Sequence, residues 1–218
     1  MTLDLIIYLS VLTVVTGVGI WLYPNLLRPW RGIVILFCLT SAVEIVGHIS
    51  GMSSENLNLI YQIYTPLSFG LYTLVFRFLF IEKKNKLFSD AMLLLILLVG
   101  VGFPFINTLA DFPSLSIAIC SLGLILESLV MFRELMKSPE TTAISRNPRF
   151  ILSTAILVYW GLFFFRHGLY NSLIREQNGY TIWLDDLHLW FSVAYYITLL
   201  ICVWMSYKQN KYETQSTS

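Results

Sequence analysis

Apolar runs long enough to cross a membrane recur along the whole chain. They fall at residues 4–23, 31–51, 57–81, 87–109, 113–136, 149–171 and 183–207. A helix of about twenty apolar residues spans the hydrocarbon core of a bilayer, and polar segments such as YPNLLRPWRG and KSPETTAISRNPR separate the runs. With 56% hydrophobic and 12% charged residues, the composition excludes an ordinary soluble domain. The sequence therefore predicts an all-α fold, a single domain of seven transmembrane helices over residues 1–207, followed by a short polar tail at 208–218.

The basic residues predict how this bundle is oriented. They gather at alternate ends of the runs, at Arg28, Arg31, Lys83, Lys84 and Lys86, between Arg133 and Arg149, and at Lys208 and Lys211. Because basic loops remain on the cytoplasmic side, the N-terminus is predicted to lie outside and the C-terminal tail in the cytoplasm. The net charge of +1 excludes the extended basic surface that nucleic-acid binding requires.

The stretch SAVEIVGHIS places a carboxylate and an imidazole inside the second apolar run. Glu44 and His48 are four positions apart and so share one face of a helix. A charged group at bilayer depth costs at least ~2.5–3.5 kcal/mol on insertion scales, so this face is expected to point into the bundle. The predicted orientation brings further polar side chains to the same outer level. We predict that a ligand site is formed by Glu44, His48, Tyr61, Gln62, Arg166, His167, Tyr170, Asp185 and His188.

Three interpretations of this polar cluster remain open. The groups can satisfy one another, Glu44 with Arg166 or His48, or they can line a cavity that binds a small ligand from outside. The third is a metal site built from His48, His167 and His188 with a carboxylate, a donor set that suits zinc. No compact motif such as HExxH accompanies these histidines.

A second intramembrane acid, Glu127, lies in the stretch LGLILESLVMF, toward the cytoplasmic half of the fifth run. Arg77 lies near the inner end of the third run, at a similar predicted depth. The sequence predicts a structural ion pair between Arg77 and Glu127, with a proton or ion path as the alternative.

Two stretches of the sequence resemble motifs of seven-helix families whose chemistry is known. YTPLSFGLYTL is similar to the third-helix motif of microbial rhodopsins, but the last apolar run, WLDDLHLWFSVAYYITLLICVWMSY, has no lysine for a Schiff base, so covalent retinal is not expected. SAVEIVGHIS resembles the second-helix element of the ceramidase and adiponectin-receptor superfamily of metal-dependent hydrolases. That resemblance implies a metal-ligating role for His48 alone.

A wider resemblance covers nearly the whole chain. WRGIVILFCLTSAVEIVGHIS, NLIYQIYTPLSFGLY and NPRFILSTAILVYWGLFFF look like a group of uncharacterised bacterial seven-helix membrane proteins, which implies a multi-pass protein of the bacterial inner membrane.

From these features we predict a sensor or receptor-like protein. It would bind a small molecule or lipid in an outward polar cavity and couple through basic cytoplasmic loops to a membrane or cytoplasmic protein. The alternatives are a zinc-dependent intramembrane hydrolase acting on a lipid amide or ester, and a structural or channel-forming subunit that self-associates.

Overall fold

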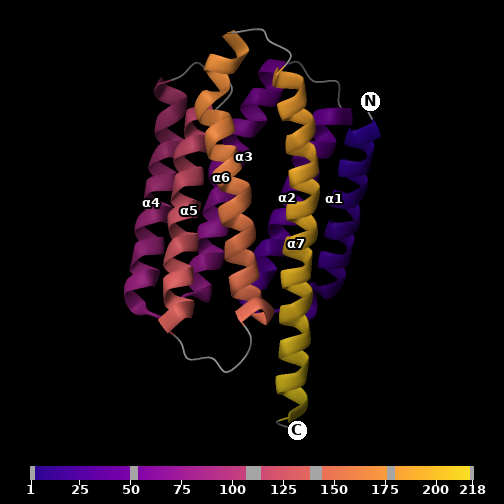
Figure 1. Ribbon diagram of the computed structural model, residues 1–218, viewed down its shortest axis with the longest axis vertical. Coiled ribbons are helices and arrows are strands. Elements are labelled where there is room, and N and C mark those ends of the chain that lie inside the picture. Colours follow the sequence, from indigo (N-terminus) through magenta and orange to yellow (C-terminus); the bar gives the residue numbers. More distant parts are fainter. Residues whose placement is uncertain (1–2, 50–53, 107–113, 138–143, 176–179, 217–218) are drawn as a thin grey trace.

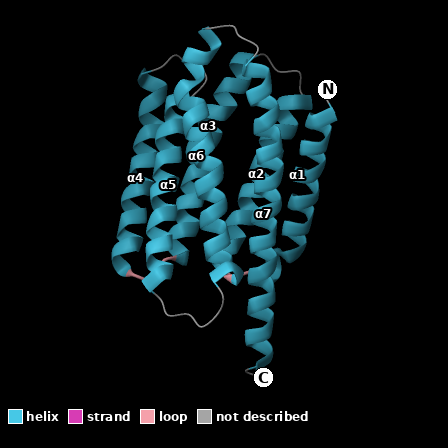
Figure 2. Ribbon diagram, viewed as in Figure 1, coloured by secondary structure: helices cyan, strands magenta, loops and turns pink. Residues whose placement is uncertain are grey.

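The computed structural model describes residues 3–49, 54–106, 114–137, 144–175 and 180–216. Within these residues the chain is helical almost throughout, as the uniform colour of Figure 2 shows, which confirms the predicted all-α fold. The α-helices are α1 (Leu3–Leu22), α2 (Arg28–Ile49), α3 (Ser54–Leu79), α4 (Lys83–Ile106), α5 (Ser114–Lys137), α6 (Pro148–Arg175) and α7 (Tyr180–Ser216), and the 3₁₀ turns are η1 (Tyr23–Asn25) and η2 (Ile144–Arg146).

Six of these helices are long and apolar enough to cross a membrane: α1, α2, α3, α5, α6 and α7. As far as it is described, α4 is not in that set, and its first turn carries three lysines, Lys83, Lys84 and Lys86. The tail predicted from residue 208 continues α7 as helix up to Ser216. The continuation follows from composition, because this segment contains no glycine or proline that would end a helix.

The helices run alongside one another, with the two chain termini at opposite ends of the bundle (Figure 1). Each helix from α1 to α7 packs on the next, and α7 returns to pack on α1, which closes a ring. Helix α3 also contacts α5 directly, so α4 lies at the edge of the bundle beside that pair. Beyond the bundle, the last turns of α7 project at the C-terminal end (Figure 1).

Close packing holds neighbouring helices together, because lipid tails offer no hydrophobic force between them. The largest fully buried side chains include Phe37, Phe69, Phe76 and Phe80. Where α4 crosses α3, a Cβ atom built on Gly100 would lie 2.5 Å from Cβ of Pro66. Only a glycine therefore permits this approach of the two backbones.

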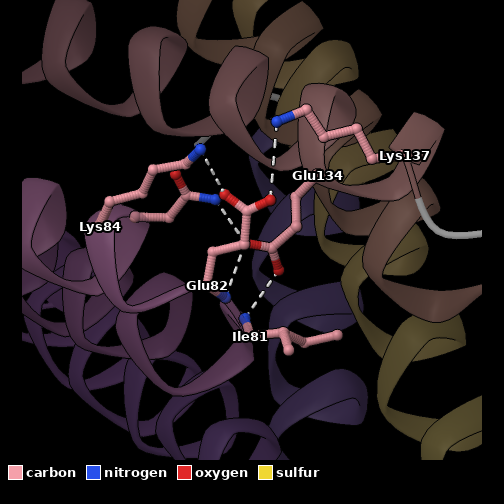
Figure 3. A network of polar contacts seen from close by, with 6 residues as sticks. Ile81, Glu82, Lys84, Glu134 and Lys137 are labelled. Atoms are coloured by element: carbon pink, nitrogen blue, oxygen red, sulfur yellow. Dashed lines mark hydrogen bonds and ion pairs between the residues drawn. The ribbon is translucent and has the colours of Figure 1, made fainter.

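The turn between α3 and α4 is fixed by a carboxylate from another helix. Glu134 of α5 accepts hydrogen bonds from the backbone N–H groups of Ile81 (2.7 Å) and Glu82 (3.2 Å), and from the side-chain amide of Asn85. Nζ of Lys84 lies 2.9 Å from one oxygen of Glu82, and Nζ of Lys137 lies 3.6 Å from the other (Figure 3). These contacts join the end of α3, the start of α4 and the end of α5.

Candidate ligand cavity

A cavity of about 460 Å³ lies inside the bundle. Its lining comes from α1, α2, α3, α5, α6 and α7, but not from α4. Several lining residues lie near the ends of helices that face the N-terminal end of the bundle, such as Leu5 of α1, His48 of α2 and Ile117 of α5. The cavity therefore occupies the half of the bundle that carries the N-terminus.

Five residues of the predicted ligand site line this one cavity: Glu44, His48, Tyr61, Arg166 and His188. They come from α2, α3, α6 and α7, which are distant in sequence, and the ring of helices brings them together. Gln62 is next to Tyr61 on α3 but is not among the lining residues. The side chains of His167, Tyr170 and Asp185 lie outside the described part of the structure.

Glu44 and His48 face each other along one side of α2. Oε2 of Glu44 lies 3.4 Å from Nε2 of His48, and the two side chains are 17% and 37% exposed, respectively. Their spacing of four residues places them on adjacent turns, as the sequence predicted. This geometry supplies one of the mutual contacts expected for the cluster, and both side chains still line the cavity.

On the opposite helices, the cationic and imidazole groups lie against aromatic rings. The guanidinium carbon of Arg166 is 5.9 Å from the ring centre of Phe163. The rings of Phe163 and His188 meet edge to face, with centroids 4.4 Å apart. Such contacts hold the polar side chains in position against an apolar surface.

Away from these polar groups, the cavity wall is aromatic. Tyr159 of α6 stacks on Tyr195 of α7 with ring centroids 4.0 Å apart and planes within 4° of parallel. Trp160 packs against Phe69 with a centroid distance of 4.5 Å, and its indole N–H donates to the hydroxyl of Tyr195 (3.3 Å). The hydroxyls of Tyr159 and Ser192 are hydrogen-bonded at 3.0 Å. The hydroxyls of Tyr159 and Tyr195 and the indole N–H of Trp160 therefore have hydrogen-bond partners inside the bundle.

Sequence reasoning missed most of this aromatic wall. The missed aromatic lining residues are Tyr8, Tyr64, Phe69, Tyr72, Tyr159, Trp160, Phe163 and Tyr196. A signal was present on α3, where the lining residues follow helical spacing at positions 61, 64, 65, 68, 69 and 72. A stripe of tyrosine, serine and threonine with that period is an amphipathic face turned to the bundle interior.

The structure describes two of the three histidine side chains of the predicted metal site. His48 and His188 line the same cavity, but the side chain of His167 lies outside the described residues. Among the side chains that the structure describes, no three His, Cys, Asp or Glu residues gather closely enough to hold a metal ion. The zinc assignment therefore stays a prediction.

The predicted ion pair between Arg77 and Glu127 is wrong. The guanidinium of Arg77 pairs with Asp90 of α4. The carboxylate of Glu127 instead accepts hydrogen bonds from Thr73 and Ser89. The physical reason is the short connection between α3 and α4, which brings Arg77 and Asp90 face to face on neighbouring helices.

Comparison with known proteins gives no family for this fold and cavity: no family model, curated protein or solved structure matches the chain. The resemblances noted in the sequence, to microbial rhodopsins, to ceramidase-type hydrolases and to bacterial seven-helix proteins, therefore stay predictions.

Proposed function

We propose that the chain is a sensor or receptor-like membrane protein that binds a small amphipathic molecule in its cavity. The observation that carries this proposal is the composition of the lining: an aromatic wall with a few polar groups, Glu44, His48, Arg166 and His188, gathered from three helices. Small-molecule sites are typically clefts of ~300–1,000 Å³ with this combination of apolar wall and sparse polar contacts. The cavity, at about 460 Å³, falls in that range.

The arrangement of the lining favours a ligand with a flat unsaturated body and a polar head. Tilted and edge-on rings such as those of Tyr159, Trp160 and Phe69 offer faces and edges to a planar apolar group. Glu44 and His48 on one side, and Arg166 on another, provide donors and acceptors of both charge signs for a head group. A lipid-soluble signal or cofactor of this shape would enter from the outer half of the membrane.

We further propose seven membrane spans, with α4 as the fourth, and an N-terminus outside the cell. The basic residues Arg31, Lys84 and Arg146 then mark the cytoplasmic end, as expected for a protein of the bacterial inner membrane. In this orientation the cavity lies in the outer half of the bilayer. The projecting end of α7 would lie in the cytoplasm, where it and the basic loops offer a surface for a partner protein.

Cysteine labelling in intact cells tests this orientation, after Cys38, Cys120 and Cys202 are replaced by alanine. Single cysteines at the exposed positions Asn56 and Lys84 lie on opposite ends of the bundle. A membrane-impermeant maleimide should label the position-56 variant in intact cells, and the position-84 variant only after the membrane is opened. The reverse pattern would overturn the orientation and the outward-facing cavity.

Binding is tested by thermal shift of the purified protein with a panel of compounds that pair a planar unsaturated body with a carboxylate, ammonium or hydroxyl head. At least one head-group class should raise the melting temperature of the wild type, and His48→Ala and Glu44→Gln should weaken that binding at least tenfold without loss of fold. Thr198→Ala, at a half-buried position of α7 that does not line the cavity, is the matched control and should bind normally.

Two results would contradict the proposal. In the first, both cavity variants lower the melting temperature of the apoprotein and no compound binds the wild type, which is the outcome expected for a purely structural polar cluster. In the second, stoichiometric zinc in the wild type disappears in His48→Ala, which would favour the hydrolase instead.

A further inference from the structure

A second buried polar site lies apart from the cavity, around Glu127 in the middle of α5. Its carboxylate is fully buried, with 0% exposure. The cavity residue of the same helix, Ile117, is ten positions earlier, which is about 15 Å along an α-helix at 1.5 Å per residue. Glu127 is therefore not part of the ligand cavity.

Three helices meet at this carboxyl group. The hydroxyl of Thr73 on α3 donates to Oε2 at 3.0 Å, and the hydroxyl of Ser89 on α4 donates to Oε1 at 2.6 Å. The nearest charged residues along α3 and α4 are Arg77 and Asp90, and these pair with each other. Farther along α5, Arg133 is exposed, and Glu134 is bound to the turn before α4. In the part of the chain that the structure describes, no Lys, Arg or His forms an ion pair with Glu127.

An ionised carboxylate is unstable in such a place. Removing an unpaired charge from water costs far more than two hydroxyl hydrogen bonds return, and a group in that position takes up a proton and becomes neutral. Neighbouring hydroxyls tolerate the change, because each can rotate to donate or to accept. A neutral carboxyl group can therefore keep both contacts, with its own O–H donated to one hydroxyl.

We propose that Glu127 is an intramembrane proton-binding site, distinct from the ligand cavity, that links α3, α4 and α5 through Thr73 and Ser89. The proton adds to one carboxylate oxygen and leaves from it, with no other bond made or broken. Exchange takes place from the end of the bundle that carries the α3–α4 turn, because Arg77, which is 39% exposed, follows Thr73 by one turn of α3 toward that surface.

Infrared spectroscopy of the full-length protein in lipid nanodiscs tests the site directly. At neutral pH the wild type should show the C=O stretch of a protonated carboxylic acid, which shifts in D₂O and on carboxyl-¹³C labelling of glutamate. Glu127→Gln should remove the whole band, whereas Glu44→Gln, which changes the carboxylate of the cavity, should leave it intact. Ser89→Ala removes one hydrogen bond to the carboxyl group and should shift the band without removing it.

Three outcomes would overturn the proposal: no carboxylic acid band in the wild type at neutral pH, a band that persists in Glu127→Gln, or a band that appears only when choline replaces sodium. The last result would assign the site to sodium. If Glu127→Gln fails to fold, the isotope shift and the Ser89→Ala shift of the band still decide the question, since both are measured with Glu127 present.

Discussion

Replacing Glu134 with alanine should detach the turn between α3 and α4 from α5. The carboxylate is 6% exposed and accepts from two backbone N–H groups, those of Ile81 and Glu82 (Figure 3). It also accepts from the side-chain amide of Asn85. The N–H groups belong to the residues that immediately precede α4, which begins at Lys83. Glu134 thus acts as a cap on the turn before α4, supplied by a different helix, and accepts from the N–H group of Glu82 as the carboxylate of a capping box accepts from the N-cap residue.

The expected loss in the free energy of unfolding follows from the hydrogen-bond donors that the alanine would leave without an acceptor. Loss of a side-chain cap costs about 0.5–2 kcal/mol, and one buried donor without a partner costs about 1–3 kcal/mol. Asn85 is itself buried. We therefore expect Glu134→Ala to lower the free energy of unfolding by about 2–4 kcal/mol. Glu134→Gln should lose less, because its amide oxygen still accepts.

The assay is unfolding in mixed detergent micelles, followed by tryptophan fluorescence. Glu82→Gln is the matched control, because it changes an acidic residue of the same network whose partners are the exposed amines of Lys84 and Lys137. Partly exposed ion pairs contribute little, so the control should unfold close to the wild type. Equal stability of Glu134→Ala and Glu82→Gln would refute the assignment of Glu134 as the cap.

Two further predictions concern packing and pH. Gly100→Ala should lower the free energy of unfolding by about 1–3 kcal/mol through overpacking, measured by the same assay, whereas Gly17→Ala, where no atom lies within 4 Å of the added Cβ, should not. Lys84, and to a lesser degree Lys137, hold the pKa of Glu82 below its usual value. The stabilisation that these lysines give should be present at neutral pH and be lost as the pH falls through the acidic range. Glu82→Gln should abolish this pH-dependent part of the free energy of unfolding.

The helical architecture could be predicted because backbone hydrogen bonding in lipid is decided within each segment of the chain. A backbone in lipid must satisfy its hydrogen bonds within one segment, so each apolar run of sufficient length becomes a helix. The run at 31–51 corresponds to α2 (Arg28–Ile49), and the run at 113–136 corresponds to α5 (Ser114–Lys137). The hydropathy of a run does not determine where its helix begins and ends. Helix α7 extends beyond its apolar run because the polar residues that follow still favour helix.

Contacts between helices were harder to predict, because they depend on how each helix is rotated. Arg77 and Glu127 were matched by estimated depth alone, and depth does not say which side of a helix faces which neighbour. Asp90 was overlooked because it lies within an apolar run, yet it is the residue that the short α3–α4 turn brings opposite Arg77. In contrast, Glu44 and His48 were placed correctly side by side, since their spacing within one helix fixes their relation.

The structure also shows that α3 belongs to both polar sites. Tyr72 lines the ligand cavity, and the next residue, Thr73, donates to Glu127. Successive residues of a helix lie about 100° apart around its axis, so these two side chains point to different neighbours while sharing one backbone. A displacement of α3 by a fraction of an ångström would alter the 3.0 Å contact between Thr73 and Glu127, because hydrogen-bond strength depends steeply on geometry. Rearrangements confined to α1, α2 or α7 would leave that contact unchanged, since it is made only among α3, α4 and α5. The infrared band expected for Glu127 should therefore shift when a ligand in the cavity displaces α3. A ligand that fills the cavity without displacing α3 should leave the band unchanged.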